Sequence, residues 1–436
     1  MRREELSKQF SNKKVLIWGF GLEGKSTLNF LKKHGDNTII EIADDKELQV
    51  EGFKTMLTSN VDFNIYDIIM KSPGIVIEDE SFPFDKLCSQ SQLFLEKYRN
   101  QIIGITGTKG KSTTSSLLYH VLKENCNSVF LVGNIGVPCF DIIDEIEVDS
   151  KIVFEVSCHQ LEYATVSPHI AVLLNLYEEH IDHYGTFEKY IAAKEKIFTN
   201  QCEGDVAIIN LQCFDQVKKA PHCLTCSMDN RGDIYAEGNR LINPFSKIVV
   251  DENKVSLLGH HNFYNMAIVY IIAHHYFGVR DESFLEAIAT FKTLPHRLQN
   301  IGIIEGVRYV DDSISTICQS TIQAIESLND VDTVLVGGLD RGIDYNPLID
   351  FLAISKVSNI IFMYASGKRI YDEWCKRVDK SAFVVENLED AVKIAKNVTT
   401  KGKTCLLSPA AASYGYFKNF EERGDVFQEL VKKNAI

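Results

Sequence analysis

The stretch GITGTKGKST, residues 104–113, joins a hydrophobic strand pattern to a helical one. The pattern QIIGIT precedes its glycine-rich turn, and the helical pattern STTSSLLYHVL follows it. A turn of this kind surrounds a phosphate group with backbone N–H donors and places it at a helix N-terminus. The stretch therefore predicts a P-loop that binds a nucleotide phosphate through Gly107, Thr108, Lys109, Gly110, Lys111, Ser112 and Thr113.

The loop is shorter than the common pattern GxxxxGK[ST], because Ile105 stands where the first glycine would be. We still expect Lys111 to contact the β- and γ-phosphates and Ser112 to face a magnesium ion. Magnesium also needs hard oxygen ligands, and Glu155 ends the apolar pattern KIVFE. A carboxylate among Val, Ile and Phe is costly without a cation, so we predict that this strand neighbours the P-loop strand.

Strand and helix patterns alternate along all 436 residues, which predicts an α/β fold with mostly parallel sheets. A new strand pattern begins near Arg99, and TLPHR interrupts the pattern near Leu294. At about 100 to 200 residues per domain, three domains are expected. They are a Rossmann-like N-terminal domain (1–99), a P-loop ATPase central domain (100–293) and a Rossmann-like C-terminal domain (294–436).

Two segments are predicted to be helical and help to place these boundaries. They are DKLCSQSQLFLEKYRN, residues 85–100, and the longer LLGHHNFYNMAIVYIIAHHYFG, residues 257–278.

The overall charge and hydrophobicity limit the classes of partner. A formal net charge of −13 without a Lys/Arg run argues against nucleic-acid binding. No apolar run approaches the roughly 20 residues of a membrane span, and MRREELSKQFSNKK lacks the apolar core of a signal peptide. We expect a cytoplasmic monomer whose partners are small molecules, with neither nucleic acid nor membrane among them.

Cysteine usage favours reduced thiols over a disulfide framework, because there are 11 Cys and no export signal. Cys223 and Cys226 have the spacing of a zinc-binding pair, but no second pair of Cys or His has a matching spacing. We favour two ordinary thiols in a loop.

A second glycine motif lies near the N-terminus. Gly19, Gly21 and Gly24 match GxGxxG after a buried strand, and Asp44 stands where a dinucleotide fold has its ribose-binding acid. NAD binding is one interpretation. The alternative is structural, with the glycines serving only a tight turn and close helix packing.

Charged residues crowd the end of the strand pattern HIAVLLNL. Glu179, His180 and His183 follow it, and Lys194 lies on the helical pattern TFEKYIAAKEKIF. Considered alone, this region is a charged loop before an amphipathic helix, with Lys194 solvated.

Eight segments together resemble the Mur ligases in order and spacing: GITGTKGKST, GNIG, FEVSCHQLE, NLYEEHIDHY, YIAAKEKIF, GHHNFYN, LPHRLQ and SPAAASYGYFKNFEERG. The resemblance covers nearly the whole chain and is strongest to the D-glutamate-adding branch. It implies a ligase that uses ATP and two Mg²⁺ ions to join D-glutamate to UDP-N-acetylmuramoyl-L-alanine through an acyl phosphate. The product would be a precursor of peptidoglycan.

The resemblance also implies roles for individual residues. Ser112 and Glu155 would hold one Mg²⁺ ion, and His180 and a carbamylated Lys194 would help to hold a second, with Lys111 on the transferred phosphate. Further ATP contacts would be Asn262 and Asn265 near the adenine, Arg297, which with His296 opens the C-terminal domain, and Asp312 at the ribose.

In this family the N-terminal domain binds a UDP-linked substrate rather than NAD. The matching residues are Leu22, Glu23, Asp44, Asp45, Lys46, Ser72, Pro73, Gly74, Asn134, Ser157 and Gln160. The residues that match the amino-acid site are Thr316, Arg341, Ser413 and Phe420.

Three positions in the amino-acid site depart from the resemblance. Ile314 and Arg341 each stand where the family commonly has lysine, and Gly415 stands where it has an acidic residue. Arginine can still hold a carboxylate through two parallel hydrogen bonds. Addition of L-glutamate or another amino acid therefore stays open as an alternative.

Two alternatives from other classes are a nucleotide-binding regulatory protein and a P-loop kinase fused to an NAD domain. The presence of Lys111, Glu155, His180 and Lys194 argues against a protein that has lost ligation.

Overall fold

The computed structural model describes residues 2–79, 81–217, 223–252, 254–257, 259–292, 295–328, 330–380 and 382–433, apart from the side chain of Asp182. Contacts divide the chain into two compact units, each considered by itself below. The first is Met1–Val250 with Tyr264–Ile288, and the second is Asp251–Phe263 with Ala289–Ile436. The predicted domain boundaries at residues 99 and 293 stay predictions, and residues 293 and 294 lie outside the described part.

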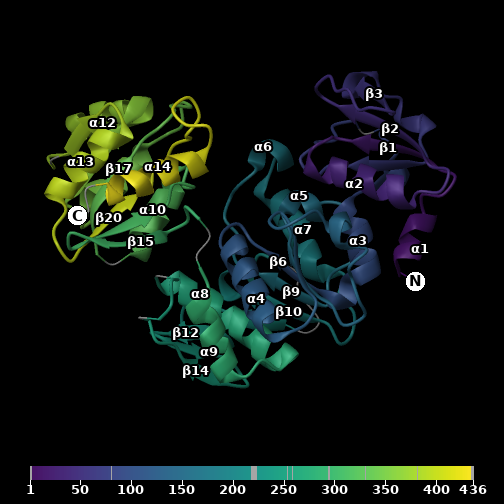
Figure 1. Ribbon diagram of the computed structural model, residues 1–436, viewed down its shortest axis with the longest axis horizontal. Coiled ribbons are helices and arrows are strands. Elements are labelled where there is room, and N and C mark those ends of the chain that lie inside the picture. Colours follow the sequence, from purple (N-terminus) through teal and green to yellow (C-terminus); the bar gives the residue numbers. More distant parts are fainter. Residues whose placement is uncertain are drawn as a thin grey trace. The chain divides into compact units, whose positions relative to one another are not determined.

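The first unit begins with a five-stranded parallel sheet in the order β3-β2-β1-β4-β5 (Figure 1). Its strands are β1 (Lys14–Trp18), β2 (Ile39–Asp44), β3 (Lys54–Leu57), β4 (Ile68–Lys71) and β5 (Leu87–Cys88). The helices of this region are α1 (Arg2–Lys8), α2 (Leu22–His34) and α3 (Gln90–Tyr98). Strand order reverses between β1 and β4, and such a switch point is where open α/β sheets bind ligands.

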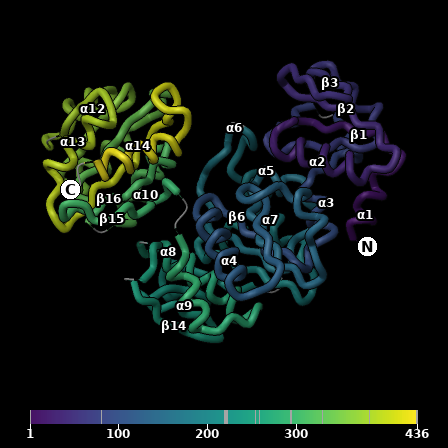
Figure 2. The backbone as a smooth tube through the Cα atoms, viewed as in Figure 1, coloured from purple at the N-terminus to yellow at the C-terminus, as the bar shows by residue number. Residues whose placement is uncertain are grey.

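A six-stranded parallel sheet follows in the order β11-β10-β9-β6-β8-β7. Its strands are β6 (Ile102–Thr106), β7 (Val129–Gly133), β8 (Lys151–Glu155), β9 (Ile170–Leu173), β10 (Val206–Asn210) and β11 (Cys223–Cys226). Its helices are α4 (Lys111–Asn125), α5 (Cys158–Leu161), α6 (Ile181–Tyr184) and α7 (Phe187–Thr199). The backbone path through both sheets can be followed in Figure 2.

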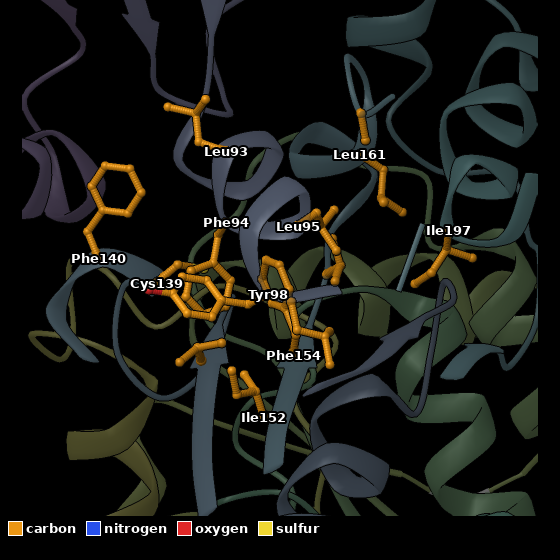
Figure 3. Packing of buried hydrophobic residues seen from close by; sticks show 14 of the residues in the cluster. Leu93, Phe94, Leu95, Tyr98, Cys139, Phe140, Ile152, Phe154, Leu161 and Ile197 are labelled. Carbon is orange, nitrogen blue, oxygen red and sulfur yellow. The ribbon is translucent and has the colours of Figure 1, made fainter. Parts of the chain in front are cut away.

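Helix α3 packs its apolar face onto the second sheet. Figure 3 shows Phe94 and Tyr98 of this helix beside Ile152 and Phe154 of β8. The rings of Phe94 and Phe154 meet edge-to-face with centroids 6.0 Å apart, and both side chains are fully buried. Buried aromatic pairs of this kind contribute beyond their buried area, so α3 is a structural part of the hydrophobic core and not a linker.

Smaller elements complete the first unit and lead into the second. An antiparallel sheet contains β12 (Tyr235–Glu237), β13 (Arg240–Ile242) and β14 (Lys247–Val249). Helix α8 (His260–Ile271) continues as the π-helical η7 (Ile272–Tyr276), and α9 (Asp281–Thr290) follows. Short 3₁₀ turns are η1 (Thr58–Asn60), η2 (Phe63–Ile65), η3 (Phe84–Lys86), η4 (Arg99–Gln101), η5 (Cys139–Ile142) and η6 (Leu211–Cys213).

The second unit is built on a six-stranded sheet in the order β15-β16-β20-β17-β18-β19. Its strands are β15 (Gln299–Ile304), β16 (Val307–Asp311), β17 (Val331–Val336), β18 (Asn359–Met363), β19 (Ala382–Val385) and β20 (Thr404–Leu407). Only β15 is antiparallel to its neighbour among these described strands. The helices are α10 (Cys318–Ser327), α11 (Asn346–Ile354), α12 (Tyr364–Arg377), α13 (Leu388–Val398) and α14 (Phe420–Lys432).

Three mostly parallel sheets confirm the predicted α/β class, with two differences in helix length. The helix expected over residues 85–100 begins only at Gln90, because Ser89 is extended and its side chain accepts a hydrogen bond from Gln92 N as an N-cap. The long helix expected to reach residue 278 changes to π-helical geometry after Ile271. Across the described residues, no helix is long and apolar enough to span a membrane.

Candidate active site

The P-loop connects β6 to α4, as predicted, and two of its glycines adopt positive φ angles. Gly107 has φ +153° and Gly110 has φ +83°, and a Cβ atom added at Gly107 would lie 2.9 Å from Leu174 Cβ. Glycine is therefore required there by conformation and by space. The amides that follow Gly110 open α4, which is the arrangement that binds phosphate.

Asn175 follows β9, the strand next to β6, and forms hydrogen bonds to the P-loop. Its side chain accepts from Lys109 N at 2.7 Å and donates to Lys109 O at 2.9 Å, while Thr108 N donates to Asn175 O at 3.0 Å. Thr108 Oγ1 also lies 2.8 Å from the hydroxyl of Tyr190 on α7. Neither Asn175 nor Tyr190 was predicted from the sequence, although Asn175 is a polar residue at the end of the apolar pattern HIAVLLN.

Lys111 lies over the loop that it follows. Its ammonium donates to Gly107 O at 2.8 Å and to Thr108 O at 2.9 Å. Burial lowers the pKa of Lys111, and the nearby carboxylates of Glu155 and Glu179 oppose that effect. The side chain is half-buried at the position where a bound nucleotide's phosphates would lie.

Glu155 stands beside the P-loop strand, as the sequence predicted. Strands β6 and β8 pair with Ile105 opposite Glu155, and the glutamate is fully buried. Its Oε1 accepts from Asn134 Nδ2 at 2.7 Å and from Ser112 Oγ at 3.3 Å. Its Oε2 is buried and has no hydrogen-bond partner among the described residues.

A magnesium ion fits this arrangement, because a buried carboxylate oxygen without a donor favours a cation. The described residues contain no group of three or more His, Cys, Asp and Glu side chains arranged to hold a metal ion. Magnesium does not require such a group, since it keeps several waters and takes substrate phosphate oxygens as ligands.

Lys194 is not the solvated helix lysine that the pattern of α7 alone would suggest. It is 1% exposed, and its ammonium donates to Gly107 O at 2.9 Å and lies 4.9 Å from the ring centre of Tyr190. Burial and, next, the positive charge of Lys111 lower the pKa of Lys194 to about 7. Burial therefore favours the uncharged, nucleophilic form of this amine far more than in an exposed lysine.

His180 precedes α6 with a left-handed backbone, φ +58°. Its ring lies 4.8 Å from that of His159, which in turn lies 4.4 Å from the ring of His183. Burial lowers the pKa of His159 to about 4, and the neighbouring cations and histidines act in the same direction. His183 Nε2 lies 3.1 Å from Glu162 Oε2. His159 and Glu162 were not singled out from the sequence.

The N-terminal glycine motif forms a closed turn at the switch point of the first sheet. Asp44 accepts from Phe20 N at 2.7 Å and from Lys46 N at 3.2 Å, and Ser72 Oγ donates to Gly19 O at 2.9 Å. A Cβ atom added at Gly24 would lie 2.1 Å from Gly19 O. Gly24 therefore fills the structural role of close packing and Gly19, with φ +90°, that of a tight turn, whereas a Cβ atom added at Gly21 would meet no described atom within 4 Å.

Other residues predicted to bind the UDP-linked substrate lie near this turn, and two of them form a helix cap. Leu22 is 80% exposed at the start of α2. Gln160 and Ser157 form a capping box for α5, and Gln160 Nε2 also donates to Glu23 Oε1 at 2.8 Å. Glu23 Oε2 is buried without a partner among the described residues, and burial raises the pKa of Glu23. The structure also describes the remaining candidates there, Asp45, Lys46, Pro73 and Gly74, as partly or fully exposed.

The residues predicted to contact adenine and ribose fall in both units. Asn265 belongs to the first unit and lies beside the P-loop, since a Cβ atom added at Gly110 would come within 3.5 Å of its Oδ1. Asn262, Arg297 and Asp312 belong to the second unit, and their part in one ATP site stays a prediction.

Asp312 is buried and already accepts several hydrogen bonds. Its Oδ2 accepts from Ser315 Oγ at 2.6 Å and from Ser408 Oγ at 2.7 Å. Burial raises the pKa of this carboxyl to about 6. Beside it, Asp311 Oδ2 lies 2.8 Å from His296 Nδ1.

Three residues predicted for the amino-acid site lie close together at the carboxyl ends of strands in the six-stranded sheet of the second unit. Strands β16, β20 and β17 are adjacent and parallel, so the loops that follow them emerge together. Arg341 Nη2 donates to Thr316 O at 3.1 Å, and Leu339 N donates to Ala412 O, next to the buried Ser413, at 2.8 Å. Phe420 begins α14, where its carbonyl accepts from Ser313 Oγ at 2.8 Å.

Comparison with known proteins agrees with this geometry. Residues 105–273 match the family described as the Mur ligase middle domain. A UDP-N-acetylmuramoylalanine–D-glutamate ligase of Aquifex aeolicus is 32% identical over 96% of this chain and 98% of its own. The protein of that name from Clostridium acetobutylicum is 30% identical, over 99% of each chain.

Solved structures show the same fold at low sequence identity. A MurF ligase from Thermotoga maritima in complex with ADP matches with a TM-score of 0.60 and 19% identity over 98% of this chain and 97% of its own. MurF from Acinetobacter baumannii matches with a TM-score of 0.63 and 14% identity over 99% and 98%. With relatives at or above 30% identity along almost the full length, the chain belongs to the Mur ligase family.

Proposed function

We propose that this protein is an ATP-dependent ligase that joins D-glutamate to UDP-N-acetylmuramoyl-L-alanine. The full-length relatives that carry this activity in their names support the identity of both substrates. The reaction would supply peptidoglycan precursors in the cytoplasm, and we expect the enzyme to act as a monomer.

The observation that carries the proposal is the pairing of β6 with β8. It brings the buried Glu155, with its unpartnered Oε2, against the hydroxyl of Ser112 at the start of α4. A P-loop, its half-buried Lys111 and a buried carboxylate that can bind a metal ion lie at the ends of adjacent strands, and they support transfer of a nucleotide's γ-phosphate.

In the first step, the terminal carboxylate of the UDP-linked substrate attacks the γ-phosphorus of ATP. An oxygen–phosphorus bond forms, and the bond to the bridging oxygen of ADP breaks, which leaves an acyl phosphate. The ammonium of Lys111 stabilises the negative charge that moves onto the phosphate oxygens, while the amides after Gly110 orient them.

In the second step, the amine of glutamate attacks the acyl carbon. A carbon–nitrogen bond forms through a tetrahedral intermediate, inorganic phosphate leaves, and the nitrogen loses a proton. Carboxylates are poor acyl donors because their oxygen is a poor leaving group. Phosphorylation converts that oxygen into part of a phosphate, which leaves readily. Arg341 is proposed to hold a carboxylate of the incoming amino acid, with Thr316 and Ser413 nearby.

Two Mg²⁺ ions would neutralise charge between nucleotide and substrate carboxylate. Ser112 and Glu155 would hold one of them, and His180 and a carbamylated Lys194 would contribute to the other. The lowered pKa of Lys194 supports this, because carbamylation requires the neutral amine: nitrogen adds to the carbon of CO₂ and releases a proton. The buried ammonium thereby becomes an anionic oxygen ligand.

A rescue experiment tests the carbamate. Lys194→Ala should be nearly inactive, and short-chain carboxylic acids should restore activity because they can occupy the place of the carbamate. Wild-type activity without added acid would remove Lys194 from the proposed mechanism.

Three residues favour an alternative amino-acid substrate. Ile314, Arg341 and Gly415 all depart from the usual amino-acid site, so a Mur-type ligase that adds L-glutamate or another amino acid is the alternative. A more distant alternative is a nucleotide-binding regulatory protein, which would bind ATP without releasing phosphate.

One experiment separates these functions. The protein is incubated with ATP, Mg²⁺ and UDP-N-acetylmuramoyl-L-alanine. Amino acids from a panel that includes both enantiomers of glutamate are offered one at a time, and product mass and phosphate release are measured for each. We expect the mass of the D-glutamate adduct. A preference for L-glutamate would support the alternative acceptor, and ATP binding without any adduct would overturn the ligase proposal.

A further inference from the structure

Arg369, on α12, forms hydrogen bonds to the loop that carries Arg341. Its Nε donates to Asp340 Oδ2 at 2.6 Å and its Nη2 donates to Asp340 Oδ1 at 2.8 Å. Two parallel charge-assisted bonds fix the orientation of the carboxylate as well as its distance. Asp340 immediately precedes Arg341, the residue proposed to hold the incoming amino acid.

The same guanidinium also holds the far side of the loop. Arg369 Nη2 donates to Ile343 O at 2.8 Å, and its guanidinium carbon lies 5.0 Å from the ring centre of the buried Tyr345. Asp340 Oδ1 in turn accepts from Gly342 N at 2.9 Å. Arg369 therefore contacts the loop before and after Arg341.

The beginning of the loop is anchored through its backbone N–H groups. Gly338 N donates to Ser366 Oγ at 2.8 Å, and Leu339 N donates to Ala412 O at 2.8 Å. The side chain of Arg341 itself is exposed and makes one described hydrogen bond, to Thr316 O. Its direction thus depends on the conformation of the loop rather than on surrounding side chains.

We infer that Arg369 is a positioning residue for the amino-acid substrate, acting through Asp340 to present Arg341 to a substrate carboxylate. The inference rests on the proposed acceptor role of Arg341. Binding a carboxylate requires the guanidinium fork to be oriented in advance, and a loop released from Arg369 would have to be ordered again on binding. The effect should fall on the affinity for the amino acid and leave the affinity for ATP unchanged.

The test measures KM for D-glutamate and for ATP in Arg369 variants. Arg369→Ala should raise KM for D-glutamate by about ten- to a hundredfold, as expected for a misplaced binding group, without changing KM for ATP. Arg369→Lys should give a smaller rise, since an ammonium keeps the charge but not the two-pronged geometry. Arg377→Ala is the matched control, because Arg377 ends the same helix and bonds instead to Asn346 and Asp350.

The double variant Arg341→Ala/Arg369→Ala distinguishes positioning from direct binding. If Arg369 acts through Arg341, the double variant should have the KM for D-glutamate of Arg341→Ala alone. Additive increases would mean that Arg369 contacts the substrate itself and would overturn the inference. Thermal unfolding of each variant identifies general loss of structure, which would lower the fraction of active enzyme, and so kcat, without raising KM for D-glutamate alone.

The outcomes also separate this inference from the proposed function. If Arg341→Ala leaves KM for D-glutamate unchanged while ligation proceeds, the proposed acceptor role fails and the inference falls with it. If Arg341→Ala raises that KM and Arg369→Ala does not, the inference alone is wrong.

Discussion

Replacing Lys194 with methionine should make the protein more stable and inactive at the same time. Methionine keeps much of the volume of the lysine side chain but has no amine to protonate or carbamylate. Lys194 is 1% exposed, and burial holds its pKa at about 7 instead of 10.5. The folded protein thus disfavours the charged form that the unfolded chain accepts readily.

The sign of the pH dependence follows from that pKa. The folded pKa lies below the unfolded one, so the penalty is complete below pH 7 and disappears as pH rises toward 10.5. Full protonation at a pKa lowered to about 7 costs about 5 kcal/mol in free energy of unfolding. Loss of the hydrogen bond to Gly107 O offsets about 1 kcal/mol of the gain.

Urea denaturation in CO₂-free buffer measures the effect at two pH values. At pH 6, Lys194→Met should raise the free energy of unfolding by about 3 to 4 kcal/mol, and at pH 9 the gain should be about 2 to 3 kcal/mol smaller. Lys189→Met, at an exposed position on the same helix, should change stability by less than about 0.5 kcal/mol at both. Equal effects of Lys194→Met at pH 6 and pH 9, or a loss of stability at pH 6, would refute the reasoning.

Four further substitutions test other parts of the molecule. Lys111→Ala and Glu155→Gln should abolish ADP formation and leave the circular dichroism spectrum unchanged, and near-normal turnover in either would contradict the P-loop assignment. Gly24→Ala should lower the free energy of unfolding by about 1 to 3 kcal/mol, because the added methyl group overlaps a backbone oxygen 2.1 Å away. Gly21→Ala is its control, as a Cβ atom there meets no described atom within 4 Å, and equal effects would argue against crowding. Arg341→Ala should weaken D-glutamate binding by about 2 to 5 kcal/mol, seen as a KM rise that ATP does not share.

Sequence patterns predicted the surroundings of the P-loop correctly because its parts follow strands, whereas phosphate binding there stays a prediction. The apolar run before Glu155 identified a buried strand, and the cost of a carboxylate there was enough to predict the neighbouring strand correctly. The pattern of one strand does not show which strands lie beside it. A buried carboxylate such as Glu155 narrows the possibilities, because it must lie beside a strand that brings a cation or hydrogen-bond donors to it.

The burial of Lys194 could not be predicted from its helix. In the pattern YIAAKEKIF, Lys194 and Glu195 are adjacent, and both are buried in the structure. Helical periodicity places only some residues inside and cannot show that a helix lies between a sheet and a phosphate loop. The role of Asn175 in holding the P-loop could not be predicted either, because its partners Thr108 and Lys109 are far away in sequence.

The residues proposed to bind the incoming amino acid belong to one compact unit with its own hydrophobic clusters. Thr316, Arg341 and Ser413 follow three adjacent strands of a single sheet, whereas Lys111 and Glu155 lie in the other unit. One contiguous stretch of gene, residues 289–436, would therefore encode the proposed choice of amino acid, together with the predicted ATP contacts Arg297 and Asp312. A recombination event that exchanged this stretch would transfer the proposed amino-acid specificity to a new lineage, while the P-loop and Glu155 were inherited with the other unit.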